Sequence, residues 1–208
     1  MRGFDMELFY RLFAGFYDLL DITYFRNYEK SPRKALLDAI SENDRVLDLC
    51  TGTAANAIRI ASAKQGQQIV GVDLSAEMLN VAKGKIKRAG LKNIELLQMD
   101  ATHLEFREHS FDKILLSLVL HEVDESVANQ ILAEAKRVLK PDGEILLTEW
   151  EPSGHFLQRL LFLPISLLEP KPYRSFIKKD LPSYFESLGL RVQSVKHCNY
   201  SQVFCLKK

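Results

Sequence analysis

The stretch Val46-Leu47-Asp48-Leu49-Cys50-Thr51-Gly52-Thr53-Ala54 decides the fold of this chain. Its apolar first half predicts a buried strand, and its small residues predict a tight turn that opens a helix. A second apolar strand, at 68–72, runs into Asp73, at roughly the separation that nucleotide-binding folds leave before a ribose-binding carboxylate. The two strands together predict a site for an adenosine-containing ligand. The turn lacks the Gly-x-Gly-x-x-Gly pattern, which disfavours a dinucleotide.

The composition indicates one cytoplasmic domain. The 208 residues are 47% hydrophobic, with 28 basic and 27 acidic side chains, so we expect one sizeable core and no overall charge that attracts nucleic acid. The three cysteines, at 50, 198 and 205, have neither metal-ligand spacing nor the even number of a disulfide framework, which favours a reducing compartment and no metal site. We expect neither a signal peptide nor a membrane span, because charged residues interrupt the N-terminal segment and the most apolar stretch, 156–168, is too short.

Apolar periodicity and capping residues predict that strands alternate with helices. Helices are expected at 32–40, 54–64, 76–89, 125–139 and 173–188, and strands from 45 and at 68–72, 94–98, 111–117, 144–150, 191–196 and 201–206. Ser31 and Ser75 are the expected N-caps of the first and third helices. This order is typical of an α/β fold with a mainly parallel sheet.

Four segments, taken in order, carry a resemblance to a known family. They are residues 46–57, Val-Gly-Val-Asp-Leu-Ser-Ala-Glu-Met at 70–78, Leu-Gln-Met-Asp-Ala-Thr at 97–102, and Arg-Val-Leu-Lys-Pro-Asp-Gly-Glu-Ile-Leu-Leu-Thr at 137–148. With them the chain resembles the class I S-adenosylmethionine-dependent methyltransferases, in the branch of the ubiquinone and menaquinone C-methyltransferases. The resemblance implies a Rossmann-like three-layer sandwich, in which a seven-stranded, mostly parallel sheet has an antiparallel edge strand.

The resemblance also implies a division of the single domain, residues 1–208. A helical cap covers 1–44, a cofactor-binding core 45–150, an acceptor lid 151–172, and a closing helix and hairpin 173–208. The first motif departs from the family's Asp/Glu-x-Gly-x-Gly-x-Gly, because Cys50 and Ala54 replace two glycines and Gly52 keeps the central one. Alanine lacks the freedom of glycine at positive φ, so we expect Ala54 to adopt a helical angle at the start of the next helix.

The expected cofactor is S-adenosylmethionine. The turn and the helix N-terminus beyond it suit the carboxylate of its methionine moiety, Asp48 its ammonium group, and Asp73 the ribose hydroxyls. Asp100 and Ala101 resemble the family's adenine-binding pair, and Leu74 and Met78 are candidates to sandwich the adenine. The complete set is Asp48, Cys50, Thr51, Gly52, Thr53, Asp73, Leu74, Met78, Asp100, Ala101 and Ser117.

Each of these roles has a structural alternative. Asp48 would then order the turn, Asp73 would cap the following helix, Asp100 would cap a short turn, and Met78 would fill the core.

Three residues are candidates for the acceptor side: His121, Glu149 and Tyr17. His121 follows the fourth strand, where a histidine can act as a general base, and its alternative is a solvated loop residue. In the quinone methyltransferases that the chain resembles, this place has Arg-Asn-Val, whereas this chain has His121-Glu122-Val123. This departure weighs against a quinone as the substrate. Glu149 ends the fifth strand. Tyr10, Tyr17 and His155 are further candidates, the tyrosines either closing over the site or packing on the sheet edge.

We expect methyl transfer to a small or lipophilic acceptor. No basic stripe with interleaved aromatics is present, nor the Asp/Asn-Pro-Pro-aromatic signature of amino-methylating enzymes, so nucleic acid is disfavoured. The apolar segment 156–168, bordered by cations, predicts either peripheral membrane contact or a lid that packs on the core. Two alternatives for the whole chain are a non-catalytic S-adenosylmethionine-binding protein and, less favoured, a nicotinamide-dependent dehydrogenase.

Overall fold

A computed structural model describes residues 28–151, 176, 179–198 and 200–208. Tyr10, Tyr17, His155, most of the expected lid and the first part of the expected cap lie outside the described residues. The helical elements are η1 (Tyr28–Lys30), α2 (Pro32–Ala39), α3 (Ala55–Ala63), α4 (Ala76–Arg88), α5 (Glu125–Val138) and α8 (Leu181–Ser187). The strands are β1 (Arg45–Leu49), β2 (Gln68–Asp73), β3 (Ile94–Gln98), β4 (Phe111–Ser117), β5 (Leu139–Trp150), β6 (Arg191–His197) and β7 (Ser201–Lys207).

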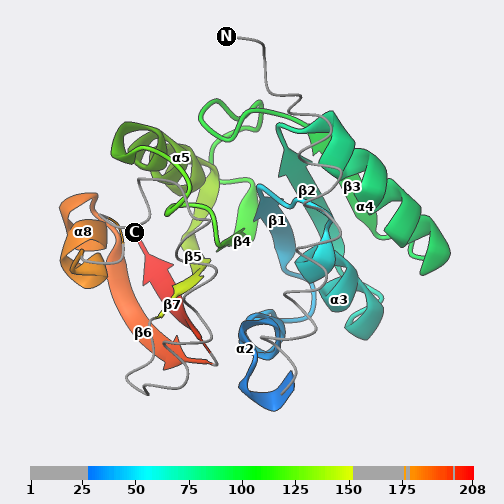
Figure 1. Ribbon diagram of the computed structural model, residues 1–208, viewed down its shortest axis with the longest axis horizontal. Coiled ribbons are helices and arrows are strands. Elements are labelled where there is room, and N and C mark those ends of the chain that lie inside the picture. Colours follow the sequence, from blue (N-terminus) through cyan, green and yellow to red (C-terminus); the bar gives the residue numbers. More distant parts are fainter. Residues whose placement is uncertain (1–27, 152–175, 177–178, 199) are drawn as a thin grey trace, which may run out of the picture.

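The strands form one sheet in the order β3-β2-β1-β4-β5-β7-β6. Strands β1 to β5 pair in parallel, and β7 pairs antiparallel with both β5 and β6. The expected Rossmann-like sheet is therefore confirmed, with its antiparallel strands at one edge (Figure 1). From β1 the chain proceeds outward to β2 and β3, and it then returns to place β4 on the other side of β1. Ligands bind at this switch point, beyond the carboxyl ends of the strands.

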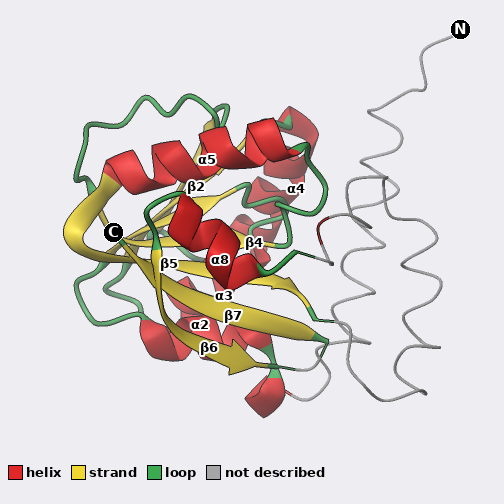
Figure 2. Ribbon diagram, turned by 90° about the vertical axis from the view of Figure 1, so that its left-hand side faces the viewer, coloured by secondary structure: helices red, strands yellow, loops and turns green. Residues whose placement is uncertain are grey.

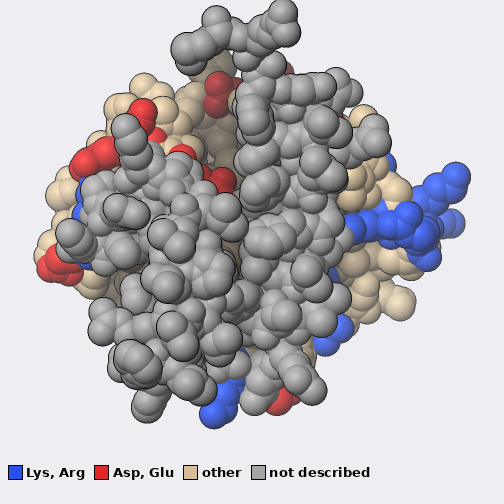
Figure 3. Space-filling view, viewed as in Figure 1, with Lys and Arg blue, Asp and Glu red and all other residues tan. Residues whose placement is uncertain are grey.

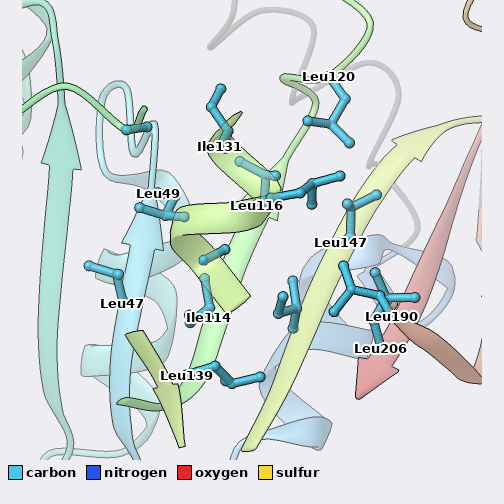
Figure 4. Packing of buried hydrophobic residues seen from close by; sticks show 14 of the residues in the cluster. Leu47, Leu49, Ile114, Leu116, Leu120, Ile131, Leu139, Leu147, Leu190 and Leu206 are labelled. Atoms are coloured by element: carbon cyan, nitrogen blue, oxygen red, sulfur yellow. The ribbon is translucent and has the colours of Figure 1, made fainter. Parts of the chain in front are cut away.

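Helices cover both faces of the sheet (Figure 2). Alternate residues of a strand point to opposite faces, so β1, β4 and β5 each supply both of the two hydrophobic cores. The larger core packs beneath α5 and α8 and includes Leu47, Leu49, Ile114, Leu116 and Leu147, most of them visible in Figure 4. The smaller core lies with α2 and α3 and includes Val46, Leu115 and Leu146. Burying one such leucine contributes about 1.5–3 kcal/mol, so the middle strands hold the site rigidly.

Two element boundaries differ from expectation because of prolines and glycines. The expected helix at 173–188 is interrupted at Lys179 and Asp180, and α8 begins at Leu181 with Asp180 as N-cap and a proline in its first turn, a placement that starts a helix but rarely continues one. Strand β5 begins at Leu139, before Pro141-Asp142-Gly143, and its register against β4 shifts between Phe111 and Lys113. A Cβ on Gly143 would lie 2.8 Å from the Asp112 carbonyl oxygen, so glycine permits this close crossing.

Cations gather on one edge of the molecule, over the end of α4 (Figure 3). The last turn of this helix carries Lys85, Lys87 and Arg88, where positive charge stabilises the helix dipole. No helix of the described residues is long and apolar enough to cross a membrane.

Candidate active site

The turn after β1 is built around the buried carboxylate of Asp48. The Thr51 hydroxyl donates to Asp48 Oδ2 at 2.6 Å, and the Thr51 amide donates to the Val72 carbonyl at 2.9 Å. Gly71 makes room for this contact, because a Cβ there would lie 3.1 Å from Thr51 Cγ2 and 2.9 Å from Leu96 Cδ2. The first two parallel strands are thus tied together at their carboxyl ends.

The expectation for Ala54 is wrong. Its φ of 59° and ψ of 32° are left-handed, and α3 begins one residue later, at Ala55. Cys50 and Gly52 also have positive φ, at 53° and 55°, so the turn reverses hand at every second residue. The Ala54 amide donates to the Thr51 carbonyl at 2.9 Å, which closes the turn and holds alanine in a conformation that costs roughly 1–2 kcal/mol.

Asp73 bridges the ends of β2 and the first turn. Its Oδ2 accepts from the Gly52 amide at 2.7 Å, and its Oδ1 accepts from the Ser75 amide at 2.9 Å. Ser75 also caps α4, its hydroxyl accepting from the Met78 amide at 3.2 Å. The expected cap is therefore confirmed, and the helix does not depend on Asp73 for its N-cap.

Burial makes this pair of carboxylates unusual. Desolvation raises the pKa of Asp48 to about 6, against the lowering effect of the Thr51 hydrogen bond, and the nearby Asp73 raises it further. Burial also raises the pKa of Asp73. The pKa of the Cys50 thiol rises to about 12, chiefly through desolvation and then through the two aspartates, so the thiol stays protonated. A cation and hydroxyl groups match these carboxylates, and S-adenosylmethionine offers both in its ammonium group and its ribose.

The adenine candidates are less uniform. Leu74 is 68% exposed. Met78 and Ala101 are buried, and Ala101 belongs to the larger core. Asp100 Oδ1 accepts from both the amide and the hydroxyl of Thr102, each at 2.8 Å, and the hydrogen bonds from Thr102 lower its pKa. The geometry of Asp100 is therefore that of the turn cap.

Two contacts near the start of α3 involve residues that sequence reasoning missed. The Asn56 amide donates to Ser117 Oγ at 3.1 Å and thereby links α3 to the end of β4. Lys85 donates to Thr53 Oγ1 at 2.9 Å and links α4 to the first turn. Both are polar residues on amphipathic helices, a position usually solvated, so their sequence carries no signal for these contacts.

On the other side of the switch point, β4 and β5 bring His121 and Glu149 together. His121 Nδ1 lies 2.6 Å from Glu149 Oε2, and the Leu120 amide donates to Oε1 at 2.9 Å. Both residues are 1% exposed, so the alternative of a solvated loop histidine is wrong. The rings of Trp150 and Phe176 lie 6.4 and 6.5 Å from the imidazole, measured between centroids.

The loop that carries His121 is strained at its start. Leu118 has a φ of 59°, and its amide donates to the Thr148 carbonyl at 2.8 Å. A leucine rarely adopts positive φ, and such residues persist where the surrounding structure holds them, often at functional sites. This turn carries the chain from β4 towards the end of β5. In the part of the chain that the structure describes, no cluster of three or more His, Cys, Asp or Glu is arranged to hold a metal ion.

Comparison with known proteins agrees with this architecture. Residues 46–143 match the family model described as a methyltransferase domain. Demethylmenaquinone methyltransferase of Bacillus cereus (strain AH187) is 30% identical over 203 residues, covering 86% of this chain and 84% of the relative. The Bacillus subtilis (strain 168) enzyme of the same name is 27% identical, covering 93% and 91%.

A solved structure confirms the fold. An S-adenosylmethionine-dependent methyltransferase from Aquifex aeolicus has a TM-score of 0.73 at 22% identity, and 98% of each chain is covered. These findings favour neither the dehydrogenase nor the non-catalytic alternative. The chain therefore belongs to the class I S-adenosylmethionine-dependent methyltransferases, and it is an enzyme that transfers the methyl group of this cofactor.

Proposed function

We propose that the acceptor is a lipophilic aromatic ring with hydroxyl groups, a quinol, and that the reaction takes place in the cytoplasm. The relatives carry the name demethylmenaquinone methyltransferase and align over most of the chain. The observation that carries the proposal is the two-part polar site at the switch point, with two carboxylates after β1 and β2 and a His–Glu pair after β4 and β5. The two carboxylates suit the cofactor, and the His–Glu pair suits an acceptor ring whose hydroxyl group must lose a proton.

We assign the cofactor contacts to the first part. Asp48 would hold the ammonium group, Asp73 the ribose hydroxyls, and the exposed Leu74 side chain a face of the adenine. The bound cofactor supplies an electrophilic methyl group on a sulfonium. The residues of this chain contribute by aligning the acceptor with that methyl group and by excluding water from it.

The acceptor's lipid character leads to a proposal for residues 156–168. This segment is mainly apolar, with Leu160 and Leu161 among its leucines. It contains Arg159, and Lys171 and Arg174 follow it in the sequence. Such a pattern suits contact with anionic lipid at a membrane surface. Flotation with anionic vesicles at low salt tests it. The wild type should rise with the vesicles, and Leu160→Ser with Leu161→Ser should remain behind. A wild type that does not rise would overturn the membrane contact.

The substrate class is tested with reduced demethylmenaquinone carrying a short prenyl tail. Purified protein and methyl-labelled cofactor should yield labelled menaquinol, identified by mass spectrometry, and Asp73→Ala should abolish most of the signal at low cofactor concentration. A cell extract provides the comparison. Label in water-soluble products alone would overturn the lipophilic acceptor, and cofactor binding without turnover of either sample would favour a binding protein.

A further inference from the structure

The His121–Glu149 pair is arranged as an oriented base rather than as a simple surface ion pair. Both oxygens of Glu149 accept hydrogen bonds, one from the Leu120 amide and one from the imidazole. A carboxylate that only accepts requires the hydrogen on Nδ1 of the histidine, so the basic lone pair of a neutral ring resides on Nε2. The orientation is set by β5, which the larger core holds in place.

Two carboxylates and two aromatic rings surround His121 in the described part of the chain. Glu149 is buried, and its carboxylate stabilises an imidazolium more strongly there than it would in water. Among the described residues, Glu122 is a second carboxylate near the ring, and its Oε1 lies 4.0 Å from Nε2 on a side chain that is 40% exposed. The aromatic rings of Trp150 and Phe176 complete a largely apolar environment. Both carboxylates favour the protonated ring.

We propose that His121 is the general base of the methyl transfer and that Glu149 is its positioning residue. This inference rests on the proposed function and narrows it to acceptors whose nucleophilic atom or conjugated hydroxyl carries a proton. The acceptor forms a bond to the methyl carbon as the carbon–sulfur bond breaks, the sulfur keeps that electron pair, and the acceptor's proton passes to Nε2. One positive charge leaves the sulfonium and one appears on the imidazolium beside Glu149, so charge balances.

The test uses His121→Gln and Glu149→Gln in the full chain, with the prenylated naphthoquinol as acceptor. A glutamine amide at position 149 can donate to Nδ1 and so move the ring hydrogen to Nε2, which removes the base. We expect kcat to fall on the order of 10²-fold or more in both variants, while the affinity for S-adenosylhomocysteine, measured by calorimetry, stays within about twofold. Glu149→Asp should restore part of the rate.

The pH profile separates a base from a structural pair. The wild-type kcat should fall towards acid as the base becomes protonated. In His121→Gln the plateau above that limb should disappear, and the rate should go on rising about tenfold per pH unit as solvent removes the acceptor's proton. The chain offers a matched control in His197 and Glu151, another histidine–glutamate pair at 2.8 Å that is exposed. His197→Gln should leave kcat and its pH profile unchanged.

The results for the wild type and for His121→Gln separate the proposed function from the inference. Wild type that does not methylate the quinol overturns the proposed function, and the inference falls with it. Wild type that turns over, with His121→Gln keeping both the rate per cofactor-binding site and the plateau of the pH profile, overturns the inference alone. If His121→Gln does not fold, the same readings on Glu149→Gln decide, since the glutamine preserves the shape of the side chain.

Discussion

The two sides of the switch point handle buried carboxylates in opposite ways. After β1 and β2, Asp48 and Asp73 accept hydrogen bonds from a hydroxyl and from backbone amides, and burial raises the pKa of both. After β4 and β5, Glu149 accepts from a histidine as well as an amide. The first side carries charge that matches a cationic ligand, and the second already contains its own partner. The first half therefore suits a cationic cofactor, whereas the second half is preorganised by its own hydrogen bonds.

The largest expected effect is on the preorganised side. Glu149→Ala removes the acceptor of both the His121 ring and the Leu120 amide, and breaking a buried pair in this way costs about 3–5 kcal/mol. The free energy of unfolding, measured with urea at pH 7.5, should fall by that amount. A loss below about 1 kcal/mol would show that the pair is weakly coupled to the fold and would weaken the contrast between the two sides.

Replacing Asp48 should raise the free energy of unfolding, whereas replacing Glu149 should lower it. The pKa of Asp48 is about 6 in the folded protein against an ordinary value of 3.8, so folding favours the protonated form and stability declines as the pH rises from about 4 to 6. Asp48→Asn should therefore stabilise the cofactor-free protein by on the order of 1–3 kcal/mol above pH 6, with the gain vanishing below about pH 4. Urea unfolding at pH 4 and 7.5 measures it. If Asp48→Asn were destabilised at pH 7.5, Asp48 would contribute to stability as Glu149 does, and the contrast between the two sides would be lost.

A smaller change in stability is expected at Thr148, on the acceptor side. Within the described part of the chain, Thr148 Oγ1 is a buried oxygen without a hydrogen-bond partner. Thr148→Val keeps the shape and should raise the free energy of unfolding by about 1 kcal/mol. Thr51→Val is the control, because it breaks the hydrogen bond to Asp48 and should destabilise instead. Thermal unfolding of the two variants at one pH distinguishes them, and equal shifts would contradict the assignment.

Much of the sheet was predictable because its signals are local. Ile94–Gln98 and Phe111–Ser117 form strands at the expected residues, and the Ser31 and Ser75 hydroxyls accept from the Lys34 and Met78 amides as N-caps should. These elements follow from apolar runs and capping residues that lie next to one another in the sequence.

The parts that sequence reasoning missed depend on contacts between distant segments. Ala54 adopts a left-handed angle because the Thr51 carbonyl accepts its amide and the turn packs against Gly71, which outweighs the local preference of alanine. His121 and Glu149 were both candidates, but their burial and their pairing follow from the register of β4 against β5. The roles assigned to Asp73 and Leu74 stay predictions.

The two aspartates are proposed to form the cofactor site, in which Asp48 binds the cation of the ligand. This proposal is tested most directly by calorimetry of S-adenosylhomocysteine binding between pH 5 and 8. The ligand's ammonium group should bind the ionised carboxylate, so affinity should be constant above about pH 6 and fall about tenfold per unit below it, with release of a proton at pH 5.5. Asp48→Asn should lose both the pH dependence and the proton release. Affinity that is independent of pH in the wild type, with no proton released, would contradict the account.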